Sequence, residues 1–165
     1  MEKVNGEVII TDEFTQRDID HSVKRHTEIF TEEYGFSEIF NESVAGLVAD
    51  FGKNFNPENE FMLVARVDGL FGGTISCICQ DDGQARLRYF FVEPFIRGHG
   101  VGRKLFTTAM EKAKEMGSKH AYFTTYNVLK PARNMYSNLG FVITHTEPDE
   151  EVAPGVIEET WEKDL

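Results

Sequence analysis

The sequence predicts an α/β or α+β protein in which one mixed β-sheet has helices on both sides. Two observations support this fold class. In four segments apolar residues recur every three or four positions, which is the spacing of an amphipathic helix. Between them lie shorter apolar runs bounded by glycine, proline or aspartate, which is typical of strands. Because the chain has 165 residues and is 41% hydrophobic, we expect residues 1–165 to form a single domain.

The first third of the chain is predicted to contain one strand and two helices. An apolar run at residues 8–10 indicates a short strand. Helical spacing then covers residues 15–34, and Gly35 is suited to end that helix. Ser37 is a favourable cap for a second helix, which ends before Pro57.

The middle of the chain is predicted to be a three-stranded antiparallel meander. Its strands cover residues 61–67, 70–80 and 85–92. The Asp-Gly pair at 68–69 is a strong two-residue hairpin signal, and residues 81–83 form a second turn.

The last part of the chain is predicted to alternate helices and strands. After a glycine-rich turn, one helix runs to Gly117 and a strand follows at 120–126. Residues 131–140 form a short helix, with proline in its first turn and glycine after its end. Two final strands are expected at 141–144 and 156–161.

Charge, apolar runs and cysteine content exclude several classes of function. The net charge of −11 argues against non-specific nucleic-acid binding; it is compatible with a cationic amine substrate, but also with a purely solubilising role. No apolar run approaches the ~18 residues of a membrane span, and the N-terminus is too charged for a secretory signal. We therefore expect a cytoplasmic protein. Cys77 and Cys79 are expected to be buried thiols, and no zinc-ligand spacing is present, so no metal is predicted.

Residues 92–102 have the features of a phosphate-binding turn. A strand ends, glycines follow, and a helix begins, so unpaired N–H groups and a partial positive charge are presented at the helix start. Glycines let a phosphate approach these groups, and the guanidinium of Arg97 is suited to phosphate oxygens. The dinucleotide and Walker patterns are both incomplete here. The residues alone also permit a loop that only turns the chain.

Two blocks of sequence resemble the signatures of the GNAT superfamily of acyl-CoA-dependent N-acetyltransferases. One signature, Arg/Gln-x-x-Gly-x-Gly/Ala after Val-x-Pro, is similar to Val92-Glu93-Pro94 and the following Arg97-Gly98-His99-Gly100-Val101-Gly102. The other, Ala-x-x-hydrophobic-Tyr-x-x-x-Gly-Phe, is similar to Ala132 through Phe141. The resemblance covers nearly the whole chain. It implies a mostly antiparallel sheet of six to seven strands flanked by four helices.

A closer likeness is to the acetyltransferase half of bacterial proteins that fuse a MarR-type regulator to a GNAT domain. The similar segments are Lys24-Arg25-His26, Glu33-Tyr34-Gly35, Val48-Ala49-Asp50-Phe51 and Glu159 to Leu165. No winged-helix portion is present in these residues, so we expect no DNA binding.

The resemblance implies that acetyl-CoA is the cosubstrate. Its pyrophosphate is expected on the turn formed by Arg97, Gly98, His99, Gly100, Val101 and Gly102. Its pantetheine arm is expected to pair with Phe91 and Val92 as an added strand. Many family members carry a cofactor-binding asparagine seven residues before the tyrosine. Leu129 occupies that position here, so we expect Asn127 to take this role.

The resemblance also assigns catalytic roles. Tyr136 occupies the position of the proton donor to the leaving thiolate, although a tyrosine here is also compatible with packing alone. Glu93 is the candidate general base, and His26, Glu33 and Tyr34 are expected near the acceptor. A water chain to a distant carboxylate is an equal alternative. No cysteine lies near the motif, so direct attack in a ternary complex is expected.

The sequence therefore predicts an N-acetyltransferase that acts on an amine. The alternative is a non-catalytic acyl-CoA-binding sensor or regulatory module. The acceptor and the oligomeric state stay open, although a homodimer is a common outcome. An acidic loop either attracts a cationic amine or is simply solvated; it contains Glu147, Asp149, Glu150 and Glu151.

Overall fold

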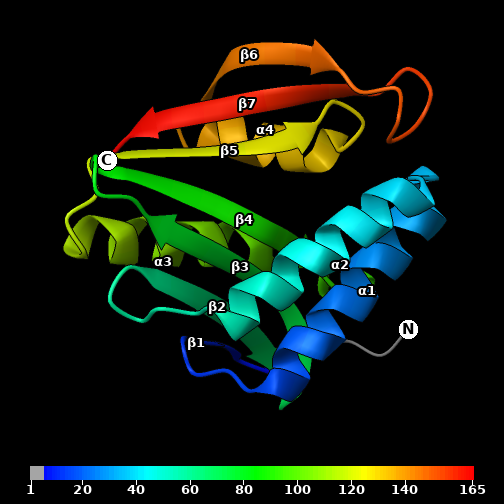
Figure 1. Cartoon of the computed structure of the whole chain (residues 1–165). Helices are drawn as coiled ribbons and strands as arrows, with labels where there is room; N and C mark the ends of the chain where they lie inside the picture. Colours follow the sequence, from blue (N-terminus) through cyan, green and yellow to red (C-terminus); the bar gives the residue numbers. More distant parts are fainter. Residues whose placement is uncertain (1–5) are drawn as a thin grey trace.

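The computed structural model describes residues 6–165, which contain the predicted strands and helices in the predicted order (Figure 1). A 3₁₀ turn, η1 (Pro94–Ile96), lies between the fourth strand and the third helix. The strands are β1 (Val8–Thr11), β2 (Glu60–Val67), β3 (Leu70–Cys79), β4 (Gln84–Val92), β5 (His120–Tyr126), β6 (Val142–Pro148) and β7 (Ile157–Asp164). The helices are α1 (Gln16–Tyr34), α2 (Glu38–Lys53), α3 (Val101–Glu115) and α4 (Lys130–Asn138).

The local signals for caps and turns are confirmed. Thr15 and Ser37 cap α1 and α2, each accepting a backbone N–H of the first turn through its hydroxyl oxygen. Gly35 ends α1 in the left-handed conformation, with φ of 66°. Asp68 and Gly69 both have positive φ, at 53° and 77°, as a type I′ hairpin turn requires.

The last two strands are longer than predicted. β7 continues to Asp164 and β6 to Pro148, although much of both strands is polar. β7 lies between β5 and β6 and pairs with both along most of its length. Backbone pairing therefore extends these strands beyond their apolar residues.

The strands form one sheet in the order β1-β2-β3-β4-β5-β7-β6. Every neighbouring pair is antiparallel except β4 and β5, which are parallel. The predicted fold class is confirmed: the sheet is mixed but mostly antiparallel, with seven strands and four helices in the described residues.

The helices cover both faces of this sheet. α1 and α2 pack on one face, in a core that includes Phe40 and Val64. α3 and α4 pack on the other, in a core that includes Leu63, Leu105 and Tyr136 (Figure 1). In residues 6–165, no helix has the length and apolar character needed to cross a bilayer.

Two irregularities in the middle of the sheet open it. β4 and β5 pair only where residues 84–86 lie beside residues 120–122, and beyond that point the strands diverge (Figure 1). β4 therefore has an edge without a partner strand over its second half. Because irregular strands commonly border functional sites, this opening is the first place to look for one.

The second irregularity is a β-bulge in β4. Between the pairs Thr74–Phe91 and Ser76–Arg88, β4 contains one residue more than β3. Tyr89 lies in this bulge with φ of 55°, which is unusual for a residue other than glycine. The hydroxyls of Thr74 and Ser76 stabilise the bulge by donating to the carbonyls of Tyr89 and Arg88, at 3.0 and 3.1 Å.

Candidate active site

The turn after β4 leads directly into the N-terminus of α3. Gly98 and Gly100 have φ of 85° and 76°, and Gly100 is the N-cap residue of the helix. No side chain caps these N–H groups within the described chain. A β-carbon at either glycine would meet no atom within 4 Å, so space is open where a ligand would approach the amides.

A cavity of about 390 Å³ lies beside this turn, and we call it the turn cavity. It is bounded by the end of β4, the start of α3, α4 and the last turns of α1. Of the residues predicted to bind the cofactor, it is lined by Phe91, Val92, Arg97, Gly98, Gly100, Val101 and Gly102. Most of the predicted cofactor residues therefore share one site.

A second cavity, of about 180 Å³, lies on the α1 and α2 side of the sheet, and we call it the aromatic cavity. Its walls come from α1, α2 and the diverging strands β4 and β5. Four residues line both cavities: Phe30, Phe90, Leu129 and Tyr136. The two cavities therefore meet at the opening between β4 and β5.

Tyr136 occupies the place where the cavities meet. Its ring is buried against Phe106, Phe123 and Trp161, with centroids 4.5 to 5.5 Å apart. Burial raises the pKa of the Tyr136 hydroxyl well above its usual value, and an interaction with Thr125 offsets part of this rise. Tyr136 is therefore protonated at neutral pH and able to donate a proton into either cavity.

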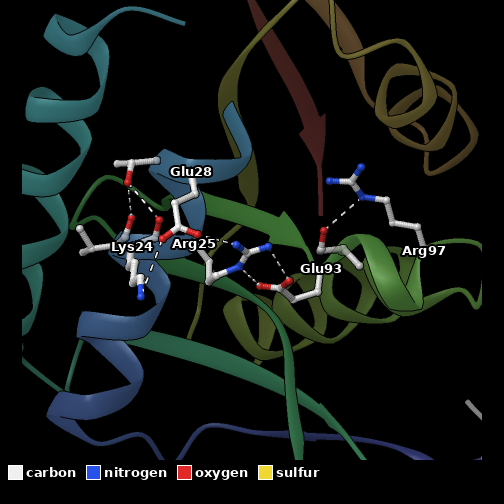
Figure 2. Close-up of polar contacts among 8 residues, drawn as sticks. Lys24, Arg25, Glu28, Glu93 and Arg97 are labelled. Carbon is white, nitrogen blue, oxygen red and sulfur yellow. Dashed lines mark hydrogen bonds and ion pairs between the residues drawn. The ribbon is translucent and has the colours of Figure 1, made fainter. Parts of the chain in front are cut away.

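Glu93 lies outside both cavities, in an ion pair with Arg25 of α1. The Nε and Nη2 groups of Arg25 donate to its two carboxylate oxygens at 2.7 and 3.0 Å. Figure 2 shows that Arg25 also contacts Glu28, at 2.6 Å, and that Lys24 lies beside Glu28. With 8% of its side chain exposed, Glu93 holds α1 against the end of β4.

We therefore expect Glu93→Gln to affect stability more than catalysis. The variant leaves the guanidinium of Arg25 with one fewer charged acceptor, so the free energy of unfolding should fall by about 1.5–3 kcal/mol in urea titrations. Glu28→Gln is the matched control. Glu28 is more exposed, and its change should stay below about 1 kcal/mol.

The same Glu93→Gln variant separates a structural role from the general-base role that the sequence suggested. If Glu93 only positions α1, kcat for amine acetylation below the unfolding temperature should change by less than about threefold. A loss of about 100-fold or more with unchanged stability would instead assign Glu93 as the base.

Arg97 and Glu33 form an ion pair at the edge of the turn cavity. Nη1 of Arg97 lies 2.8 Å from both Glu33 oxygens, and its Nε donates to the carbonyl of Val92 at 3.2 Å (Figure 2 shows the latter contact). Glu33, predicted near the acceptor, lines neither cavity. It positions Arg97 beside the turn.

The other two predicted acceptor residues lie in different cavities. His26 lines the aromatic cavity and stacks on Phe30 with ring centroids 4.4 Å apart. Burial lowers the pKa of His26 to about 4, so its imidazole is neutral at pH 7. Tyr34 lines the turn cavity, where burial, and secondarily the charge of Glu33, raise the pKa of its hydroxyl.

Asn127 and His99 line neither cavity. The side-chain oxygen of Asn127 accepts the N–H of Ile157 at 2.9 Å, and its backbone N–H donates to the Ile157 carbonyl. Asn127 therefore fixes the end of β5 to the start of β7.

Sequence reasoning missed several residues of the aromatic cavity. Arg86 and Arg88 alternate with apolar residues on β4, a pattern that indicates solvent exposure. Tyr89 and Tyr126 also line the cavity. A bulge signal in the sequence could have identified Tyr89, but no glycine or proline marks the bulge.

Comparisons with known proteins agree with this arrangement. The model of the acetyltransferase (GNAT) family matches residues 23–141. A segment of 69 residues is 42% identical to the uncharacterized N-acetyltransferase YjgM of Escherichia coli (strain K12), covering 42% of this chain and 38% of that protein. The similarity therefore spans well under half the length of that curated relative.

Two solved structures show the same fold. An acetyltransferase of the GNAT family from Staphylococcus aureus Mu50 has a TM-score of 0.78 at 18% identity, over 96% of this chain and 99% of that chain. The PaiA N-acetyltransferase from Thermoplasma acidophilum, in complex with coenzyme A, has a TM-score of 0.72 at 16% identity, over 96% and 99%. The family match extends from α1 through the turn after β4 to the end of α4 and takes in most of the residues around both cavities, so this chain belongs to the acetyltransferase (GNAT) family.

Proposed function

We propose that this protein transfers the acetyl group of acetyl-CoA to an amine by direct attack in a ternary complex. The meeting of the turn cavity and the aromatic cavity at Tyr136 carries this proposal. It provides two binding volumes, on opposite faces of one sheet, with a proton donor between them. Such an arrangement holds two substrates together for a single displacement.

The turn cavity fits acetyl-CoA in its chemistry. The open N–H groups before and at the start of α3 suit the pyrophosphate, and Arg97 lies beside them. The pantetheine arm would extend along Phe91 and Val92, on the edge of β4 that has no partner strand. A member of this fold has been solved with coenzyme A, which supports the assignment.

The amine nitrogen then attacks the thioester carbonyl carbon, with backbone N–H groups of β4 available to stabilise the negative oxygen. When the carbon–sulfur bond breaks, the thiolate receives the proton of the Tyr136 hydroxyl. The attacking nitrogen loses one proton. His26, with a pKa of about 4, is a weak acceptor for it, so we propose that water carries this proton away and reprotonates Tyr136.

Titration of acetyl-CoA by calorimetry, followed by measurement of CoA release with a panel of amines, tests this function. Binding together with amine-dependent release is the expected result. Binding without release for every amine would favour the alternative, a non-catalytic acyl-CoA sensor or regulatory module. Absence of binding would contradict both.

Two further features of the sequence are proposals of the same kind. We propose that residues 1–165 act as one domain, because both layers pack on one continuous sheet. The likeness to the acetyltransferase half of MarR–GNAT fusions rests on four short segments of sequence, and we propose it only as a kinship.

A further inference from the structure

We infer that the acceptor is a small amine that also carries a carboxylate, with a compact apolar group. This inference rests on the proposed function and names the class of its second substrate. It comes from the charge, the unpaired polar atoms and the size of the aromatic cavity.

The charge of the aromatic cavity is positive. Arg86 and Arg88 line it, and its lining within residues 6–165 includes no aspartate or glutamate. The acidic loop between β6 and β7, which suggested a cationic amine, contributes no lining residue. A cavity with this lining repels a purely cationic ligand and favours one with an anionic group.

Unpaired polar atoms gather in the same cavity. Five buried side-chain atoms in residues 6–165 have no hydrogen-bond partner, and three of them line this cavity: Nδ1 of His26, Nε of Arg88 and the hydroxyl of Tyr89. Buried donors are normally paired, so unpaired ones in a cavity indicate where a ligand binds. The guanidinium of Arg88 and the hydroxyl of Tyr89 are both donors, and a carboxylate offers two acceptor oxygens to them.

The neighbouring charges identify Arg88 as the main recognition group. Arg86 lies near Glu158, whose pKa is raised by burial and by Asp149 and Glu147 and lowered by Arg86, so part of the Arg86 charge is balanced. Arg88 forms no ion pair within 4 Å among residues 6–165. Its guanidinium carbon lies 5.1 Å from the centre of the Tyr89 ring, so the two donors are adjacent.

The size and apolar walls of the cavity limit the rest of the ligand. Phe30, Phe40, Val44 and Leu47 form its helical side. Its volume of about 180 Å³ is slightly larger than the ~150 Å³ of an engineered cavity that holds benzene. The ligand therefore carries one apolar group of about that size, as in a leucine- or phenylalanine-like amino acid.

Matched pairs of ligands test this inference. Leucine is compared with 3-methylbutylamine, and phenylalanine with 2-phenylethylamine; each pair differs only by the carboxylate. In calorimetric titrations of the CoA-saturated protein, we expect the amino acid of each pair to bind at least about tenfold more tightly. Arg88→Met should remove this preference while the plain amines keep their affinity. Arg86→Met should reduce it less, and Arg17→Met, on the exposed face of α1, should leave it unchanged.

The outcomes distinguish this inference from the proposed function. Equal or tighter binding of the plain amines, no binding of either member of a pair, or a carboxylate preference that survives Arg88→Met would overturn the inference. If plain amines are then acetylated, the proposed function stands with another acceptor class. If amino acids bind as expected but no CoA is released, the carboxylate site stands and the transferase function fails.

Discussion

Gly100→Glu is expected to weaken acetyl-CoA binding by at least about 100-fold, a loss that calorimetry would register as absence of binding. Gly100 has φ of 76° at the N-cap of α3, and its missing β-carbon leaves open space on the wall of the turn cavity. A glutamate would fill that space and place a negative charge where the pyrophosphate is proposed to bind. The positive φ also costs about 1–2 kcal/mol for a residue with a side chain.

The matched control is Gly117→Glu, after the other end of α3. Gly117 also has positive φ, 100°, and open space around its missing β-carbon, but it lines neither cavity. Both variants therefore carry comparable backbone strain and the same added charge. If Gly117→Glu binds acetyl-CoA normally while Gly100→Glu does not, strain alone is excluded as the cause. If Gly100→Glu binds within about threefold of the wild type, the pyrophosphate is not on this turn.

Tyr136→Phe is expected to lower kcat by about 10²–10⁴ while leaving the affinity for acetyl-CoA nearly unchanged. The substitution removes only the hydroxyl. The ring keeps its contacts with Phe106, Phe123 and Trp161, so the fold and the wall of the turn cavity remain. Thermal unfolding and acetyl-CoA titration of the variant establish that its loss is chemical.

The raised pKa of Tyr136 sharpens this test. Because burial keeps the hydroxyl protonated above its usual range, the wild-type rate should not fall between pH 7 and pH 9 through loss of the acid. Tyr122→Phe, on β5 and outside both cavities, removes a comparable hydroxyl and should retain full activity. Retention of kcat within about threefold in Tyr136→Phe would show that water, not Tyr136, protonates the thiolate.

The Arg25–Glu93 pair links the fold to both predictions. It fixes α1 to the end of β4, and α1 contributes Phe30, which lines both cavities. A substitution that loosens this pair should therefore change the affinity for both substrates together. By contrast, Gly100→Glu acts on the acetyl-CoA side and Arg88→Met on the acceptor side.

The order of helices and strands could be predicted from the sequence because its signals are local. Ser37 is three residues from the amide that it caps, and Asp68 and Gly69 form their turn alone. The turn from Arg97 to Gly102 was predictable for the same reason, since glycines and a helix start are adjacent in sequence. The position of Tyr136 came from a family signature, and its proton-donor role is still a prediction.

Only the tertiary structure decided which charged groups are free. Arg25 and Glu93 are 68 residues apart in sequence, Arg97 and Glu33 are 64 apart, and Asn127 meets Ile157 across 30 residues. Arg88, which the strand pattern placed in solvent, lies in a cavity because β4 bulges and diverges from β5. Whether a carboxylate or a guanidinium is available for chemistry depends on the partner that long-range packing brings to it, and local sequence patterns do not encode that partner.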